Sequence, residues 1–378
     1  MKAIKGLFLL ILSLVVLSVN AQTDNRKANI SGILYQLTFN IPENPAEKVS
    51  GKATITFDIK SKQDVVLDFQ GTPGNVLVYK ANKGKGKKAS VKVQNDKIII
   101  PAKMFKPGTN KVAIDFTCQE KALTRSGNVV YTQVQADEGR ALFPCFDDND
   151  MRAQYQTTIN APAGWKSVTV DFAEKIAPVD YTFITGKLFE KTSNTDGRNL
   201  RILYSETDPD KVAQIDQVFQ EVAKSMKWME GYTGIGNPYE KECVIFILPS
   251  LDLGGLERRG YIALSEKTIF LGKKPSKEEL LKRTELIAHE TSHIWFGNIT
   301  SIDEPWAKEV LANFMASKIT RSQYKKDEVE VSFISTHFTA TRHVPPAPTA
   351  FQPDSINGTS GVGPRAFTAD LPSRLRTL

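Results

Sequence analysis

The sequence predicts a multidomain fold in which an all-β sandwich or saddle-like domain is followed by an α+β domain. From about residue 30 to residue 204, short segments alternate apolar and polar residues at regular intervals, as strands with one buried face do. Beyond residue 205 the apolar residues recur every three or four positions instead, which is typical of helices packed on a core. The 378 residues are enough for two or three domains with substantial cores.

Residues 1–21 are predicted to be a signal peptide and not part of the fold. Lys2 and Lys5 give a basic start, residues 7–18 are an apolar run, and Ala21 ends a cleavage site of small residues. The run is short for a membrane span, and the residue after the cleavage site is Gln22 and not the cysteine of a lipid anchor. We therefore expect an exported protein, periplasmic or secreted, with no stable membrane anchor after cleavage.

Charge and cysteine content exclude several classes of protein. Net charge is +7, but lysines and acidic residues are interspersed apart from the lysine-rich residues 83–88. That run lies between strand-like segments and lacks interleaved aromatic residues, which indicates a solvated loop and no nucleic-acid partner. Cys118, Cys145 and Cys243 are too few for a disulfide framework, although one bridge remains possible.

The first domain is expected to span residues 22–205. Its clearest strand is residues 52–59, where apolar and polar residues alternate. Residues 91–100 indicate a hairpin that turns at Asn95 and Asp96. Further strands are expected at residues 65–69, 76–79, 112–116 and 155–159.

The second domain is expected to begin at residue 206 with a helix opened by Asp208 and Pro209 and ended by Gly231 and Gly234. Its apolar stripe, which indicates core packing and not a cofactor site, comprises Ile215, Val218, Phe219, Val222, Met226 and Met229. Strands are then predicted at residues 244–248, through Ile262 and at residues 269–270.

Two of the four histidines follow on another predicted helix, four residues apart. Ser276 and Glu279 form a capping box at its start, and apolar residues recur every three or four positions after it. His289 and His293 therefore share one helix face and can bind one metal ion, while Glu290 lies within reach of a water on that metal. Such a pair also occurs by chance on ordinary helices, but the cap and the apolar face favour a zinc hydrolase.

A zinc hydrolase needs a third protein ligand, which is commonly a carboxylate. Residues 306–315 predict a helix that carries Glu309, and a packed helix would direct this side chain toward the histidines. Spacing alone leaves open that Glu309 is a surface acid. Asp303 and Glu304 precede Pro305 in a predicted loop and are better explained as solvated acids.

These motifs resemble the gluzincin aminopeptidases, the family of aminopeptidase N and the leukotriene hydrolase. Their zinc signature, HExxH followed by W-x-x-E-[GV]-x-A, is present as residues 289–293 and 306–312. The resemblance implies a thermolysin-like catalytic domain, here partial, at residues 206–343. It also implies one zinc ion bound by His289, His293 and Glu309, with Glu290 as the general base on the zinc-bound water.

Two further segments resemble substrate-binding elements of the family. Gly254, Gly255 and Glu257 match its G-x-M-E-N loop, with Leu for Met and Arg for the final Asn. The family's glutamate binds the free α-amino group, which implies peptide substrates with a free N-terminus. The segment around Gln135 resembles the S1 side of the pocket, and residues 143–147 resemble a structural F-P-C-x-D element, so that Cys145 is not expected to be a nucleophile.

Three departures from the family pattern bear on activity. Fifteen residues separate His293 from Glu309 where the family normally has eighteen, and the difference falls in residues 300–305. The family stabilises the oxyanion with a downstream tyrosine, whereas no tyrosine follows Tyr324 here. Residues 344–378 contain six prolines and three glycines and are expected to be an irregular tail, which indicates either a linker or a truncated or frame-shifted reading of a longer gene.

The resemblance predicts a zinc-dependent aminopeptidase. The alternative is a catalytically impaired or inactive homologue that binds peptides or a partner through the same cleft; the retained Glu290 argues against it and the missing tyrosine argues for it. A zinc endopeptidase is a second alternative, which Glu257 and its loop disfavour.

Overall fold

The computed structural model describes residues 26–79, 84–132, 139–169, 175–237, 242–252, 254–258, 260–300, 302 and 305–341. The predicted signal peptide, Gln135, the acids Asp303 and Glu304, and the tail at residues 344–378 lie outside these ranges. Within them, no helix has both the length and the hydropathy required to cross a membrane.

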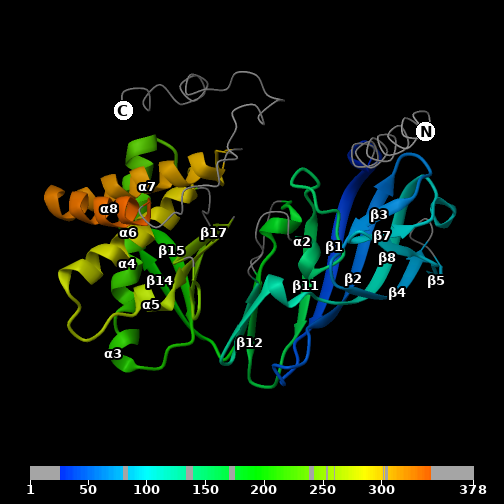
Figure 1. Ribbon diagram of the computed structural model, residues 1–378, viewed down its shortest axis with the longest axis horizontal. Coiled ribbons are helices and arrows are strands. Elements are labelled where there is room, and N and C mark those ends of the chain that lie inside the picture. Colours follow the sequence, from blue (N-terminus) through cyan, green and yellow to red (C-terminus); the bar gives the residue numbers. More distant parts are fainter. Residues whose placement is uncertain are drawn as a thin grey trace, which may run out of the picture.

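The first domain is built almost entirely of strands, as the sequence predicts (Figure 1). A six-stranded sheet has the order β11-β1-β2-β8-β4-β5, a three-stranded sheet the order β3-β7-β6, and a four-stranded sheet the order β12-β13-β10-β9. The strands are β1 (Ile30–Asn40), β2 (Ser50–Ile59), β3 (Val65–Asp68), β4 (Thr72–Tyr79), β5 (Lys87–Lys88), β6 (Lys92–Gln94), β7 (Lys97–Ile100), β8 (Gly108–Thr117), β9 (Leu123–Ser126), β10 (Val129–Thr132), β11 (Gln154–Asn160), β12 (Lys166–Thr169) and β13 (Phe183–Gly186).

Alternating burial explains why these segments form strands. In β2 the buried residues alternate with more exposed ones, so one face of the strand lies against the core. Aromatic rings fill much of that core, and Phe57 packs edge-to-face on Phe146 with ring centroids 5.4 Å apart. The predicted hairpin is confirmed, because β6 and β7 are joined by Asn95 and Asp96 in the left-handed region, at φ 49° and 57°.

The second domain has a five-stranded sheet, ordered β14-β15-β16-β18-β17, with its helices packed on the side away from the first domain (Figure 1). Its strands are β14 (Phe189–Thr195), β15 (Arg198–Tyr204), β16 (Cys243–Leu248), β17 (Gly255–Arg258) and β18 (Tyr261–Ser265). Its helices are α3 (Pro209–Val212), α4 (Ile215–Thr233), α5 (Glu266–Ile269), α6 (Lys277–His293), α7 (Pro305–Arg321) and α8 (Lys326–Thr341). The all-β domain followed by an α+β domain is therefore confirmed.

The second domain begins before the predicted boundary, because the hairpin β14–β15 belongs to its five-stranded sheet. The hairpin β14–β15 precedes the predicted boundary at residue 206, yet β15 pairs in parallel with β16, with Ile202 opposite Ile245. The expected strand at residues 269–270 is also wrong, because Ile269 ends the short helix α5. Local periodicity identifies an extended segment, but it does not determine which sheet the segment joins.

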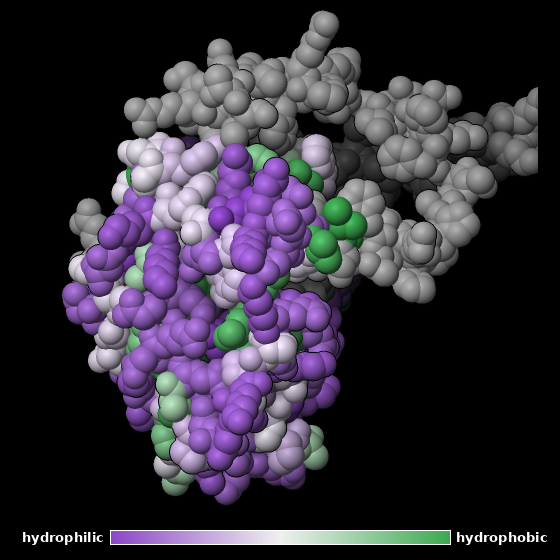
Figure 2. Space-filling model, turned by 90° about the vertical axis from the view of Figure 1, so that its left-hand side faces the viewer, coloured by the Kyte–Doolittle hydropathy of each residue, from purple (hydrophilic) through white to green (hydrophobic). Residues whose placement is uncertain are grey.

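The helix predictions agree better with the structure, because they depend on local capping. The single helix predicted from Asp208 to Gly231 and Gly234 is two helices. Asp208 caps α3 by accepting a hydrogen bond from the backbone amide of Asp210, and α3 ends at Val212. The longer α4 begins at Ile215, continues through Gly231 and ends at Gly234, at φ 71°. Ser276 and Glu279 form the predicted capping box of α6, with both reciprocal hydrogen bonds present. The outward side of the helical layer is mostly hydrophilic (Figure 2), which leaves the apolar faces of the helices for the core.

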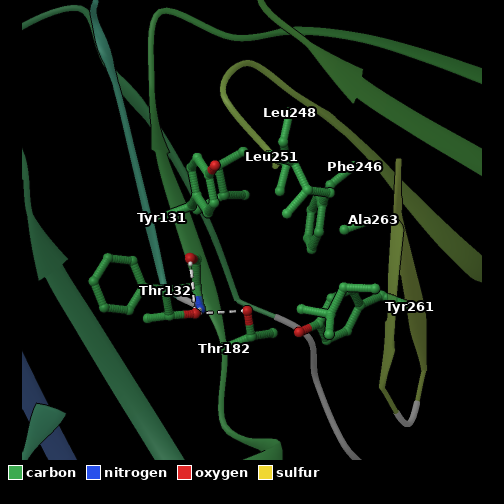
Figure 3. A pocket seen from close by; sticks show the side chains of 11 residues that line it. Tyr131, Thr132, Thr182, Phe246, Leu248, Leu251, Tyr261 and Ala263 are labelled. Carbon is green, nitrogen blue, oxygen red and sulfur yellow. Dashed lines mark hydrogen bonds between the residues drawn. The ribbon is translucent and has the colours of Figure 1, made fainter. Parts of the chain in front are cut away.

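The two domains meet across the other face of the five-stranded sheet. Tyr131 of β10 donates a hydrogen bond to the carbonyl of Pro249 at 3.0 Å, and apolar residues of β10 and β13 pack in one cluster with apolar residues of β16 and β18. Between β10, β13 and this sheet lies a cavity of about 10 Å³, about the space of one water, bounded in part by Phe246 and Tyr261 (Figure 3). The interface thus positions the end of β10, three residues before Gln135, beside the second domain.

A buried ion pair attaches α6 to α4. The side chain of Arg283 is fully buried and donates to both carboxylate oxygens of Glu221, at 3.2 and 2.8 Å. A further nitrogen of Arg283 donates to the side-chain oxygen of Gln214 at 2.8 Å. Burial raises the pKa of Glu221 and outweighs the opposing effect of the guanidinium. Removing one partner would leave a buried charge without compensation.

We expect Arg283→Met to lower the free energy of unfolding by about 3–5 kcal/mol, because Glu221 would stay buried without its cation. Chemical denaturation followed by tryptophan fluorescence measures the loss. Lys282→Met is the matched control on the same helix, since Lys282 is exposed and pairs only with Glu278 in the described residues, which is worth less than about 0.5 kcal/mol. Equal destabilisation by the two substitutions would contradict this assignment.

Candidate metal centre

The last turns of α6 bring two imidazoles together. His289 and His293 are four residues apart on the helix, so their side chains point the same way, and their Nε2 atoms lie 3.0 Å apart. The two rings are nearly perpendicular, with an interplanar angle of 88°. His293 is buried, while His289 is partly open to solvent. One nitrogen of each ring therefore points at a common position.

The turn after α6 orients the ring of His293. Its Nδ1 lies 3.3 Å from the carbonyl oxygen of Phe296, an acceptor, so that Nδ1 is the protonated nitrogen. Nε2 then keeps its lone pair on the side of His289. Metal-binding histidines are commonly held in this way by a hydrogen bond at the other ring nitrogen.

The helix α7 brings Glu309 to the two histidines. Its Oε2 lies 3.3 Å from Nε2 of His289 and 3.5 Å from Nε2 of His293. The connection between α6 and α7 is compact because backbone hydrogen bonds continue beyond the end of α6. The amide of Asn298 donates to the carbonyl of His293, and the amide of Thr300 donates to the carbonyl of Trp295. Fifteen intervening residues are thus enough for Glu309 to reach the pair. A hydrogen bond from His289, the nearer of the two imidazoles, is the main cause that holds the pKa of Glu309 well below its usual range.

The three donor atoms fit a tetrahedral metal ion. Bonds of about 2.0–2.1 Å at tetrahedral angles separate neighbouring ligand atoms by about 3.3 Å. The observed separations of 3.0, 3.3 and 3.5 Å bracket that value. Two imidazole nitrogens and one carboxylate oxygen form a set that suits zinc and leaves a fourth position open.

Glu290 is buried beside the donors. Only 4% of the residue is exposed, and burial together with the charges of Glu257 and Glu309 raises the pKa of its carboxyl group well above the usual range. Gly255 of β17 makes room for this side chain, since a Cβ at that position would lie 2.0 Å from Oε1 of Glu290. A carboxylate in this environment is suited to exchanging a proton with a reacting group.

Glu257 reaches the same place from the sheet. It lies on β17, is 5% exposed, and has its Oε2 3.8 Å from Nε2 of His293. Its other carboxylate oxygen, Oε1, forms an ion pair with Nζ of Lys308 on α7. The site therefore contains a second carboxylate that is not among the three closest metal donors.

The structure brings most of the predicted site residues together, namely His289, His293, Glu309, Glu290, Glu257 and Gly255. Gly254 lies in the preceding turn with φ 81°, where its carbonyl accepts from the amide of Ser265. Gln135 lies outside the described residues. The residue that the sequence analysis missed is Lys308; its position directly before Glu309 on the same helix could have indicated its proximity to the site.

Two other predicted features lie away from the donors. Tyr324 has its hydroxyl 3.2 Å from Oγ1 of Thr284, more than one helical turn before His289. Cys145 is buried in the first domain, where desolvation raises the pKa of its thiol well above the usual range. A buried thiol of this kind does not act as a nucleophile, in agreement with the sequence analysis.

Comparison with known families and proteins places both domains. Residues 32–169 match the peptidase M1 N-terminal domain, and residues 217–357 match the peptidase family M1 domain. The chain is 29% identical over 216 residues, 52% of its length, to a leucyl aminopeptidase of Saccharolobus solfataricus, of which this covers 27%. It is 27% identical over 310 residues, 73% of its length, to a probable aminopeptidase of Sulfurisphaera tokodaii, of which this covers 38%.

A mammalian relative matches over more of the chain. Endoplasmic reticulum aminopeptidase 2 of Bos taurus is 23% identical over 348 residues, which are 82% of this chain and 34% of that protein. The chain thus spans about a quarter to two fifths of the length of these relatives, with shares of 27%, 38% and 34%.

If the three donors form a metal site, the protein should bind one equivalent of Zn²⁺, and Glu309→Ala should weaken that binding by more than about 100-fold. Competition with a chromogenic chelator measures the affinity. Glu330→Ala is the control, because that partly exposed carboxylate pairs with Arg321 at the end of α7 and with Lys326 at the start of α8, away from the donors. Unchanged zinc affinity in Glu309→Ala would show that Glu309 is not a ligand.

Proposed function

Because the chain belongs to peptidase family M1, we propose that it is a zinc-dependent aminopeptidase, which removes residues from the N-termini of peptides. The observation that carries the proposal is the meeting of five side chains at one place: His289, His293 and Glu309 as donors, with Glu290 and Glu257 beside them. The first three residues would hold one zinc ion. The other two supply what a peptidase specific for N-termini needs, a base and an anchor for a cation.

The proton transfers are assigned to Glu290. Zinc, when bound, would polarise the scissile carbonyl and acidify water in its open position. The carboxylate of Glu290 would take a proton from the attacking water and deliver it to the nitrogen of the leaving amine. Because the side chain is buried, bulk water would not compete for that proton.

Substrate direction is assigned to Glu257. A buried carboxylate close to the metal donors can accept a charge-assisted hydrogen bond from the α-ammonium group of a peptide. Holding that group would place the first peptide bond at the metal, so that the bond cleaved is the one next to the N-terminal residue. Glu257 therefore supports an exopeptidase over a zinc endopeptidase.

A second candidate function is peptide binding without turnover. The observation in its favour is that Tyr324 holds its hydroxyl against Thr284, so that this tyrosine does not supply an oxyanion donor at the metal site. An oxyanion donor is worth roughly 3 kcal/mol, so its loss could remove most of the activity. The donor set and Glu290 would still bind zinc and peptide.

The proposed cellular setting follows from the start of the sequence. The basic and apolar residues 1–21 support export to the periplasm or the medium. The proposed partners are peptides with a free N-terminus. Nucleic acid is not a proposed partner, since the sequence has no basic segment with interleaved aromatic residues.

We expect Glu290→Gln to lower kcat for aminoacyl p-nitroanilides by about 10²–10⁴-fold, because the amide cannot accept the proton of the attacking water. Zinc stoichiometry should stay at one, since Glu290 is not among the three donors. Glu278→Gln serves as the control, because this exposed glutamate lies at the far end of α6. Substantial residual activity in Glu290→Gln would remove the assignment as general base.

Zinc binding without any turnover by the unsubstituted protein would favour the second candidate function. Turnover that disappears with a chelator and returns with Zn²⁺ would support the first. The assay therefore pairs zinc analysis with hydrolysis of a panel of aminoacyl p-nitroanilides.

We expect Glu257→Gln to raise KM for substrates with a free α-amino group by roughly 10–100-fold, because one charge-assisted hydrogen bond is lost. N-acetylated forms of the same substrates should be cleaved poorly by both proteins. The comparison requires steady-state kinetics on matched free and acetylated substrates. Equal cleavage of the acetylated substrates by the unsubstituted protein would exclude the exopeptidase assignment.

A further inference from the structure

We propose that Lys308 is a specificity-determining residue that competes with the substrate's ammonium group for the carboxylate of Glu257. The inference rests on the proposed function, because it takes Glu257 as the anchor for that ammonium. Among the described residues, Lys308 forms its ion pair with Glu257, whereas the histidines pair with Glu309.

The geometry places a resident cation on one half of the anchor. Nζ of Lys308 pairs with Oε1 of Glu257, while Oε2 of the same carboxylate faces Nε2 of His293 at 3.8 Å. Arg258 follows Glu257 in the chain, and its Nη1 donates to the backbone carbonyl of Glu257 at 2.9 Å. Oε2, on the side of the metal donors, is the oxygen left for an incoming ammonium.

The aliphatic stem of Lys308 is held where it can make this contact. The side chain crosses Gly297 in the turn after α6, where a Cβ would lie 2.6 Å from its Cε. Gly297 has φ 139°, which also favours glycine at this position. Only 22% of the lysine side chain is exposed, so its ammonium group is directed inward and not toward bulk water.

Two cations on one carboxylate repel each other. A substrate ammonium on Oε2 and the lysine ammonium on Oε1 would lie about 5 Å apart, at ordinary hydrogen-bond lengths. In a partly buried site this repulsion is weakly screened, so it lowers the affinity of Glu257 for any free amine. Binding of substrate and release of product are affected alike, because the freed amino acid carries the same ammonium group.

The consequence is a site that recognises an N-terminal amine without retaining it. Glu257 distinguishes peptides with a free amino group from blocked ones, and Lys308 limits how tightly that group is held. Removing the charge of Lys308 should therefore strengthen the binding of an amine. If the lysine only held Glu257 in position, its removal would weaken that binding instead.

The test uses leucinol, an amino alcohol that cannot be hydrolysed, and 4-methylpentan-1-ol, which lacks its amino group. Calorimetric titration of the zinc-loaded protein gives the dissociation constant of each. We expect Lys308→Met, which keeps the stem and removes the charge, to tighten leucinol binding by roughly tenfold. Binding of 4-methylpentan-1-ol should not change. Lys308→Arg retains the charge and should bind leucinol about as the unsubstituted protein does.

A double-substitution cycle assigns the effect to the pair. In a Glu257→Gln background, Lys308→Met should no longer tighten leucinol binding, because the shared carboxylate is gone. Zinc stoichiometry and thermal unfolding are measured on every variant. If Lys308→Met does not fold, Lys308→Gln removes the same charge with a polar end group and takes its place.

The outcomes separate this inference from the proposed function. If Glu257→Gln weakens leucinol binding and Lys308→Met tightens it, both are supported. If Glu257→Gln weakens it but Lys308→Met leaves it unchanged or weakens it, the lysine is not a competitor and the inference is overturned. If Glu257→Gln has no effect, Glu257 is not the amine anchor, and that part of the proposed function is overturned together with the inference.

Discussion

The docking of α6 in the core of the second domain is the constraint on which the site depends. The helix carries three of the five side chains of the proposed site, so any rotation or slip would move both imidazoles and Glu290 together. Arg283 resists that movement, because its guanidinium is bound on three sides within a region that excludes water. The ion pair with Glu221 fixes the middle of the helix, and the site is assembled at its end.

A second constraint is electrostatic. Glu257, Glu290 and Glu309 approach the same place, and the charges of Glu257 and Glu309 add to burial in disfavouring the charged form of Glu290. Cations offset this repulsion. Lys308 supplies one, and a zinc ion between the histidines and Glu309 would supply two further charges. The same balance explains why a lysine is placed where a substrate ammonium is expected to bind.

Predictions from the sequence were most accurate where a local rule applies. The capping box of α6, the hairpin turn at Asn95 and Asp96, and the shared face of His289 and His293 depend on residues within a few positions of each other. The resemblance to the gluzincin aminopeptidases added the assignment of Glu309, and the matches to both M1 domains agree with that family.

What the sequence by itself determined was the order of the domains, the helix with its two histidines, and the residue types available for metal and proton chemistry. Only the tertiary structure decided that β15 joins the second sheet, that Glu309 reaches the histidines across fifteen residues, and that Lys308 meets Glu257. The physical reason is the range of the interactions. Capping and helical periodicity act over one or two turns, whereas sheet pairing, helix packing and ion pairs join residues whose distance in space no local pattern encodes.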